Sequence, residues 1–276
     1  MGVPLLIIDM HAHVFPDRLA PAAVETVAGR AGITASHGGT LDALRQHMRA
    51  AGIAWGVLQP VASKAAQVRS INDWAAGIVD DGLIPFGAIH PDVEDIEAEM
   101  AWLAARGFGG VKLHPEYQSF RPLDERLEAL YDAAVRHNMI VYFHAGADIG
   151  FTTVHSTPNE FAQVLDAHPG LMLVLAHMGG WQQWDDVRRC LLGRDVYLDT
   201  AFTLQYLGPE ALADLIRAHG AHRVVFGSDT PWADLREALD DLKRLPLPAS
   251  DLEALLGGTA DALLTRSNAR RPPRHA

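Results

Sequence analysis

Short apolar runs alternate along the chain with longer segments in which apolar residues recur every three or four positions. This alternation is typical of a parallel sheet covered by helices, because strands buried on both faces are almost continuously apolar. Eight runs predict strands, at Leu5–His11, Ile53–Gln59, Leu83–Ile89, Gly110–His114, Ile140–His144, Met172–His177, Val196–Thr200 and Val224–Ser228. Eight such strands in 276 residues predict an α/β fold, a TIM-type (β/α)8 barrel.

The segments between the runs carry helix signals. The stretch that opens at Asp92 has early acidic residues and an apolar stripe, and it stops at Gly107, which predicts a helix. Asp124 opens a second helix in the same way. A third is expected to begin at Pro209 and to end at Gly220.

The chain offers no linker that would divide it. We therefore expect a single barrel domain over residues 1–267, followed by a disordered tail at Asn268–Ala276, which contains Arg-Arg-Pro-Pro-Arg. Residues 14–40 form a long connection after the first strand, with a short helix expected near Ala20–Ala28. Connections of this length are often functional lids, although this one can also be read as a plain insertion.

Composition narrows the class of protein. A net charge of -11 without a basic stripe argues against nucleic acids and anionic membranes as partners, which leaves a small-molecule substrate. No stretch approaches the roughly 20 apolar residues of a membrane-spanning helix, and Val3–Ile8 is too short for a signal peptide. Cys190 is the single cysteine, so no internal disulfide can form. A cytoplasmic protein is expected.

Polar residues of one chemical kind follow four of the predicted strands. His11 and His13 end the first, His144 the fifth and His177 the sixth, while Asp229 follows the eighth. Catalytic residues of such barrels come from the carboxyl ends of the strands, so these side chains are expected to meet at one face. Residues i and i+2 of a strand point to the same side, so His11 and His13 can share one cation.

The donor types favour a divalent metal. Imidazole suits zinc and related first-row ions such as manganese and iron, and a carboxylate can complete the shell. A bound metal can lower the pKa of its water from 15.7 to about 7. Taken singly, each histidine is more simply a hydrogen-bonded structural residue. The five residues in barrel order are what predict a metal site.

Four motifs carry a resemblance to the amidohydrolase superfamily, and to its branch of amidohydrolase-related proteins that includes aminocarboxymuconate-semialdehyde decarboxylase and aromatic-acid decarboxylases. The similarity spans residues 5–265. The motifs are Ile8-Asp9-Met10-His11-Ala12-His13, Val141-Tyr142-Phe143-His144-Ala145-Gly146, Leu175-Ala176-His177-Met178-Gly179-Gly180 and Val225-Phe226-Gly227-Ser228-Asp229-Thr230-Pro231-Trp232.

The resemblance implies a role for each of these residues. His11, His13, His144 and Asp229 match the metal ligands, with zinc the first expectation and one or two metals per chain. Asp229 also matches the residue that accepts a proton from the attacking water. His177 matches a histidine that acts on the substrate or on the metal-bound water, or that binds a second metal. A homodimer is a further implication of the family.

The fourth strand brings three more polar residues to the same rim. Lys112, His114 and Glu116 follow one another at every second position, and some superfamily members place a carboxylated lysine or a glutamate there to bridge two metals. Since Lys112 and His114 share a face, one of them is expected to point inward. They are candidates for a second metal or for substrate binding, beside a purely structural role.

Side chains just after strand ends are candidates for the pocket rim. They are Phe15, Arg18, Phe151, His155, Trp181 and Trp232. We choose Arg18 and Trp232, since arginine pairs with carboxylates and aromatic faces pack against rings. Each of the six can also be a packing residue.

Three functions are compatible with these residues. The first is a hydrolase, in which a metal-activated water attacks the carbonyl of an amide, lactone or ester, with Asp229 as base and then acid and His177 stabilising charge. The second is a lyase, a non-oxidative decarboxylase of an aromatic or muconate-type acid with the same metal site. The third is a barrel that has lost catalysis and serves as a scaffold, which the polar cluster disfavours because unpaired buried groups are costly.

Overall fold

The computed structural model describes residues 5–78 and 82–271, and strands and helices alternate along them. The strands are β1 Ile8–Ala12, β2 Trp55–Leu58, β3 Leu83–Pro85, β4 Gly87–Ala88, β5 Gly110–Leu113, β6 Ile140–Phe143, β7 Met172–Leu175, β8 Tyr197–Asp199 and β9 Val224–Val225. Each coincides with a predicted apolar run, with β3 and β4 dividing one run between them.

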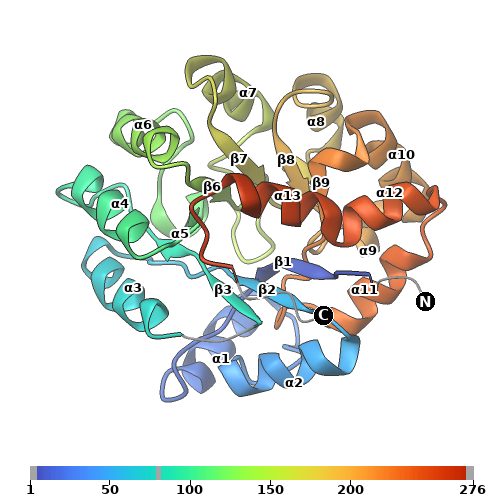
Figure 1. Cartoon of the computed structure of the whole chain (residues 1–276), viewed down its shortest axis with the longest axis horizontal. Coiled ribbons are helices and arrows are strands. Elements are labelled where there is room, and N and C mark those ends of the chain that lie inside the picture. The colour runs from blue at the N-terminus through green and yellow to red at the C-terminus, as the bar shows by residue number, and fades with distance from the viewer. Residues whose placement is uncertain (1–4, 79–81, 272–276) are drawn as a thin grey trace.

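Helices connect the strands on the outside. They are α1 Ala20–Ala31, α2 Leu41–Ala51, α3 Val68–Ala76, α4 Ile96–Ala105, α5 Pro115–Gln118, α6 Glu128–Arg136, α7 Pro158–Ala167, α8 Trp184–Cys190, α9 Leu204–Leu207, α10 Pro209–His219, α11 Leu235–Lys243, α12 Ala249–Glu253 and α13 Thr259–Arg266. Figure 1 shows most of them as a ring around the strands, with α13 lying across the end that faces the viewer.

All strand pairs are parallel, and the sheet closes on itself. The strands pair in the orders β1-β2-β3 and β4-β5-β6-β7-β8-β9. Phe86, in the break between β3 and β4, donates its backbone N–H to Leu58 O at 3.0 Å. The last strand returns to the first, where Met10 N donates to Phe226 O at 2.8 Å and Asp229 N to His11 O at 2.9 Å. The chain is therefore a (β/α)8 barrel, as the sequence predicts.

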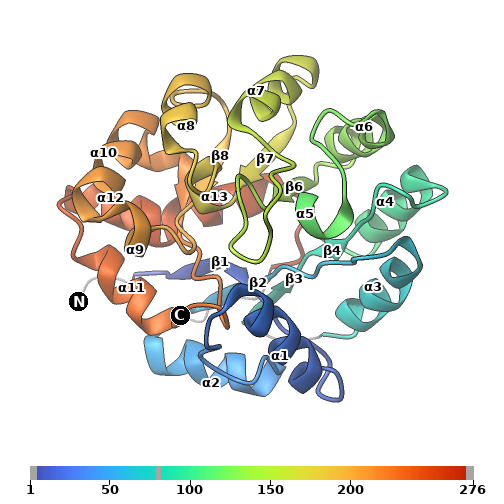
Figure 2. The ribbon, with the colours of Figure 1, turned by 180° about the vertical axis from the view of Figure 1, so that it is seen from behind.

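Alternate residues of the strands face the barrel interior and the helices. Ile140 and Tyr142 belong to the interior cluster, while Val141 and Phe143 pack in the cluster beneath the helices. This is the period of two that a strand imposes. Helix α13 crosses one end of the barrel (Figure 1), and its Leu263 and Leu264 join the interior cluster. The opposite end, seen in Figure 2, is left for the site.

The predicted helices are present, with one cap in a different place. Helix α4 is capped by Asp95, whose side chain accepts from Ala98 N, so the predicted cap at Asp92 is wrong. Asp124 caps a short 3-10 turn that leads into α6, and α10 begins at Pro209 as predicted. Within the connection 14–40, α1 reaches Ala31 and is longer than expected.

The segment after α13 is in contact with the barrel. Asn268 N donates to Asn138 O at 2.9 Å and Arg270 N to Gly107 O at 2.7 Å. For Asn268–Arg271 the expectation of a disordered tail therefore does not describe the structure, because these backbone groups find partners on neighbouring turns. Residues 272–276, the rest of that prediction, lie outside the described residues.

Candidate metal centre

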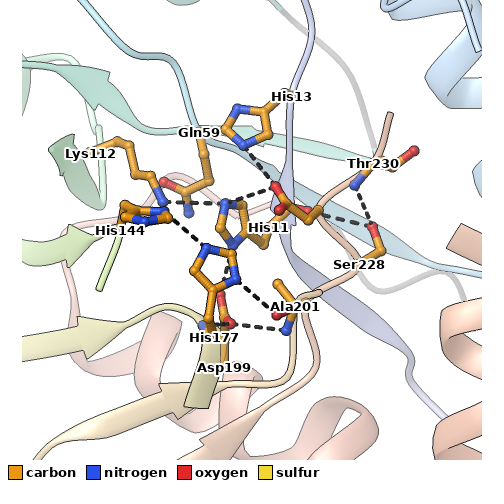
Figure 3. Close-up of polar contacts among 12 residues, drawn as sticks. His11, His13, Gln59, Lys112, His144, His177, Asp199, Ala201, Ser228 and Thr230 are labelled. Carbon is orange, nitrogen blue, oxygen red and sulfur yellow. Dashed lines mark hydrogen bonds and ion pairs between the residues drawn. The ribbon is translucent and has the colours of Figure 1, made fainter. Parts of the chain in front are cut away.

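The histidines and the aspartate singled out in the sequence meet at the open end of the barrel. His11 lies in β1, and the others follow their strands within four residues, so all of them come from carboxyl ends. In Figure 3 the side chains of His11, His144, His177 and Lys112 point toward one another, with His13 beside them. This is the face at which barrels of this type build their active sites.

Three of the side chains form a compact group. The Nε2 atoms of His11 and His13 lie 3.4 and 3.2 Å from Asp229 Oδ1. One donor atom from each residue falls within 4.8 Å of the other two, so the group can hold a metal ion. Burial raises the pKa of Asp229, but the interactions with His11 and His13 outweigh it and keep that pKa well below its usual range. Asp229 is therefore a carboxylate at neutral pH.

Asp199, which the sequence analysis missed, orients His11. Its fully buried carboxylate accepts from His11 Nδ1 at 2.7 Å and from the Tyr142 hydroxyl at 2.5 Å. Because a carboxylate only accepts, His11 carries its proton on Nδ1 and leaves Nε2 free for a metal. A carboxylate that fixes the tautomer of a ligand histidine is a recurrent feature of metal sites.

Asp9 is a second buried carboxylate beside the centre, and it joins the first and last strands. It accepts from Ser228 Oγ at 2.5 Å and from Ser228 N and His11 N at 3.0 Å each. Burial raises the pKa of Asp9 to about 7 in spite of these hydrogen bonds. Asp9 thus holds the segment that carries Asp229 against the strand that carries His11.

Two of the candidate residues have an unusual backbone. His177 and Asp229 have φ angles of 57° and 66°, in the left-handed region that costs a non-glycine residue about 1 kcal/mol or more. Hydrogen bonds hold both conformations, from His177 N to Asp199 Oδ1 at 2.7 Å and from Asp229 N to His11 O at 2.9 Å. Backbone strain of this kind concentrates at functional sites.

His144 and His177 face each other through bare ring nitrogens. His144 Nε2 lies 3.0 Å from Ala147 O, and His177 Nδ1 lies 2.9 Å from Ala201 O. Carbonyl oxygens only accept, so in the neutral rings these nitrogens carry the hydrogens. His144 Nδ1 and His177 Nε2, 3.0 Å apart, are then two acceptors in contact.

A cation would relieve this contact. A proton on His177 Nε2, donated to His144 Nδ1, would do so as well, whereas burial, followed by repulsion from His114, holds the pKa of His144 itself well below its ordinary value. Together with the group of His11, His13 and Asp229, the donor set is the imidazole and carboxylate chemistry of zinc, manganese or iron. These residues therefore fit the divalent metal that the motifs imply.

Of the three candidates from the fourth strand of the barrel (β5) and the residues after it, Lys112 is the one that lies beside His11. Its Nζ lies 3.2 Å from His11 Nε2 and 4.7 Å from the centre of the Tyr142 ring. Burial lowers the pKa of Lys112 to about 8, against the attraction of Asp199 and Asp229. An amine at this place is a direct neighbour of the predicted ligands.

His114 and Glu116 belong instead to a second polar group. His114 stacks on His144 at 4.1 Å between ring centres, and its Nε2 lies 3.2 Å from Asp148 Oδ2. Donor atoms of His114, His144 and Asp148 also lie within 4.8 Å of one another. Glu116 Oε2 is buried without a hydrogen-bond partner, 3.7 Å from His114 Nδ1. Asp148 stands in a loop, and no sequence pattern pointed to it.

The centre forms the floor of a cavity of about 790 Å³. Phe15, Arg18, Trp181 and Trp232 line it, as expected of rim residues, and the Trp232 ring lies 6.2 Å from that of His13. Phe151 and His155, the other rim candidates, are not among its described lining residues. Phe151 instead packs against the guanidinium of Arg30, 4.8 Å from its ring centre.

The sequence of this barrel matches the family model for amidohydrolases over residues 8–266. The chain belongs to the amidohydrolase family. It is thus a member of a superfamily of metal-dependent enzymes, in agreement with the donor set at the barrel mouth. Among curated proteins, none matches this amidohydrolase.

Solved structures share its fold. 5-Carboxyvanillate decarboxylase from Sphingomonas paucimobilis superposes with a TM-score of 0.73 at 16% identity, over 95% of this amidohydrolase and 99% of that chain. An uncharacterised TIM-barrel protein from Bordetella bronchiseptica gives 0.75 at 24% identity, with coverage of 95% and 99%. Dihydroxybenzoic acid decarboxylase from Polaromonas sp. JS666, with bound manganese and the inhibitor 2-nitroresorcinol, gives 0.71 at 16%, with coverage of 94% and 97%.

A membrane-spanning helix was not expected. Among the described residues of this amidohydrolase, no helix is both long enough and apolar enough to cross a bilayer.

Proposed function

We propose that this amidohydrolase is a metal-dependent, non-oxidative decarboxylase of a small carboxylic acid of the aromatic type. The observation that carries the proposal is the compact group of His11, His13 and Asp229 on the floor of a cavity that His144, Arg18 and Trp232 also line. Structural neighbours that act as decarboxylases on hydroxylated benzoic acids favour this reaction over hydrolysis.

In this proposal His11, His13, His144 and Asp229 would hold one divalent metal, manganese or zinc. The metal, when bound, would supply a Lewis acid that anchors and polarises oxygen atoms of the substrate. Asp199 fixes the donor atom of His11 through the contact of 2.7 Å with its Nδ1. Asp229 stays ionised and contributes negative charge to the ligand set.

The remaining residues bind the substrate and move a proton. Arg18 pairs with a carboxylate, and Trp232 packs against the ring beside His13. The bond between the ring carbon and the carboxyl carbon breaks, its electron pair stays on the ring carbon, and carbon dioxide leaves. A proton then bonds to that ring carbon. His177, with Nδ1 tied to Ala201 O and Nε2 facing the centre, is the group we propose to carry it.

Hydrolysis of a lactone, amide or ester, the reaction that the sequence favoured, is the second candidate. The same donor set can serve an attack by water, with Asp229 accepting the proton. A panel of candidate substrates distinguishes decarboxylation from hydrolysis. Metal-loaded protein would be given dihydroxybenzoates, carboxyvanillate-type acids and muconate-type acids while carbon dioxide is measured, and lactones, esters and amides while acid release is measured.

The proposal expects carbon dioxide from at least one acid, lost on substitution of Asp229 and retained on substitution of an exposed acid such as Asp195. Acid release from a lactone or amide without carbon dioxide from any acid would replace it by the hydrolase assignment. Absence of both reactions in protein that has taken up no added metal would favour the scaffold.

A further inference from the structure

Helix α1 turns an apolar stripe toward the cavity rather than toward a core. Leu19, Ala22, Ala23 and Val27, at spacings of three and four, all line the cavity. None of the described members of the two apolar core clusters comes from α1. Leu19 keeps 48% of its surface exposed. An apolar stripe of this kind is normally buried against other residues of the same chain. Here it is left facing a cavity, so a bound molecule could cover it.

The opposite wall offers apolar side chains between the polar residues Gln59, Ser63, Gln67 and Ser70. Val61, Ile71 and Trp74, from β2 to α3, line the same cavity. We call the part of the cavity between Leu19, Ala23, Val27, Val61, Ile71 and Trp74 the apolar annex. It is continuous with the metal centre, because one cavity is lined by both sets of residues. Figure 2 shows α1 at the rim, beside β2.

The cavity is larger than a single-ring acid requires. If each atom takes about the 30 Å³ share of a liquid water, its 790 Å³ would hold about 25 non-hydrogen atoms. A benzoate fills well under half of that space. Arg18, Lys112, Asp148 and Asp229 are the described lining residues with full charges, and none of them belongs to the annex. Its six defining side chains are apolar and uncharged, and therefore suit an uncharged group.

Contacts at the end of α1 keep the helix in place above this space. The guanidinium of Arg30 lies 5.4 Å from the ring centre of Tyr117 and 4.8 Å from that of Phe151. Helix α1 is thus attached to α5 and to the loop that carries Phe151, while its stripe faces the cavity.

We propose that the substrate carries an apolar extension, an alkyl chain or a second ring, that lies in the apolar annex while its polar head group lies at the metal centre. This inference rests on the proposed function only in taking that centre as the place of the head group. The extension would cover the stripe of α1 and bury the faces of Ile71 and Trp74.

The test measures binding, without turnover. A series of 4-n-alkylbenzoates, from the unsubstituted acid to the hexyl compound, would be titrated into manganese-loaded protein by calorimetry. Each methylene buried in the annex should lower Kd about three- to fourfold, until the annex is full. Ala23→Trp, which fills the annex, should abolish this dependence on chain length. Glu25→Trp, on another face of α1, should leave it intact.

A Kd that is flat or that rises with chain length would overturn the proposal. So would an equal fall of Kd in the Ala23→Trp variant, since the chain would then bind elsewhere. Melting temperatures of the two variants show whether each is folded. If Kd falls steeply with chain length but the protein releases no carbon dioxide from any acid, the proposal for the apolar annex stands and the proposed decarboxylase function is wrong. The two failures are therefore distinguishable.

Discussion

His144 Nδ1 and His177 Nε2 lie 3.0 Å apart, while the other nitrogen of each ring is hydrogen bonded to a backbone carbonyl. Two nitrogens held at this distance by their surroundings can share a proton or face a metal ion. Nearby, His11 and His13 direct Nε2 at the same Asp229 oxygen. The protein thus holds together a set of nitrogen and oxygen donors of the kind that a divalent metal binds.

Metal removal should destabilise the protein. Metal present at 100 times its Kd adds about 2.7 kcal/mol to the free energy of unfolding. For a chain of this size that corresponds to a fall of roughly 5–10 °C in melting temperature on chelation. Scanning calorimetry of loaded and chelated protein measures it. A melting temperature that does not respond to added manganese or zinc would contradict the metal centre.

Loss of a ligand should abolish turnover. Asp229→Asn and His144→Ala should each reduce kcat/KM by more than about 100-fold, because even partners that only orient ligands are worth 10–100-fold. Turnover and bound metal per chain are measured together. Wild-type turnover in either variant, on a confirmed substrate, would show that the ligand assignment is wrong.

Asp199 should matter although it is not a proposed ligand. Asp199→Asn removes the acceptor that keeps the His11 proton on Nδ1, and metal affinity should fall about 10–100-fold. A competition titration with a chromogenic chelator gives the affinity. Asp195→Asn, an exposed acid four residues earlier, is the matched control and should leave it unchanged. Equal affinities of all three proteins would remove Asp199 from the centre.

The buried Lys112 predicts a dependence on pH. Its pKa is lowered from 10.5 to about 8 in the folded chain, so below pH 8 the fold bears the full cost of a buried ammonium group. Between pH 8 and 10.5 the unfolded chain keeps the Lys112 proton while the folded chain has lost it. Raising the pH through this interval therefore reduces the cost and stabilises the fold. In metal-free protein, Lys112→Met should therefore be more stable than wild type at pH 7, by up to about 3 kcal/mol.

Denaturant unfolding at pH 7, 8.5 and 10 measures this difference for Lys112. It should decrease steadily as the pH rises. A difference that is constant or that grows with pH would mean that the ammonium group is not penalised in the fold.

Arg18 should act on binding more than on chemistry. Arg18→Gln should raise KM for a carboxylate substrate about 10–100-fold with little change in kcat, since a hydrogen bond to a charged group contributes about 1.5–3 kcal/mol. Arg18→Lys keeps the charge but loses the bidentate geometry of the guanidinium group. Its KM should therefore lie between those of the wild type and Arg18→Gln. A change confined to kcat would place Arg18 among the reacting groups instead.

The barrel, and the gathering of His11, His13, His144, His177 and Asp229 at its open end, could be predicted because both leave local patterns. Strands buried on two faces are continuous apolar runs, and the donors stand directly at their ends, as at His144 after β6. Asp199 and Asp148 left no such sign. Asp199 is one acid at the end of a short strand, and its role depends on His11, which is 188 residues away. Asp148 stands in a loop whose path the sequence does not determine.

The roles of neighbouring residues were equally hard to separate. Period two allows Lys112 and His114 to share a face, but only the closed barrel brings Lys112 beside His11 and stacks His114 on His144. The placement of α1 was beyond prediction for a related reason. An apolar stripe on a helix reads as a core contact, and nothing local distinguishes a stripe that faces a cavity.

The junction at which β1 meets β9 and the segment after it, closing the barrel, has a consequence for when the protein can bind its metal. His11 comes from β1 and Asp229 follows β9, where Asp229 N donates to His11 O. During translation the first of these residues is made long before the second. A nascent or truncated chain therefore has no complete donor set to load, and metal acquisition waits until the whole barrel has been synthesised and closed.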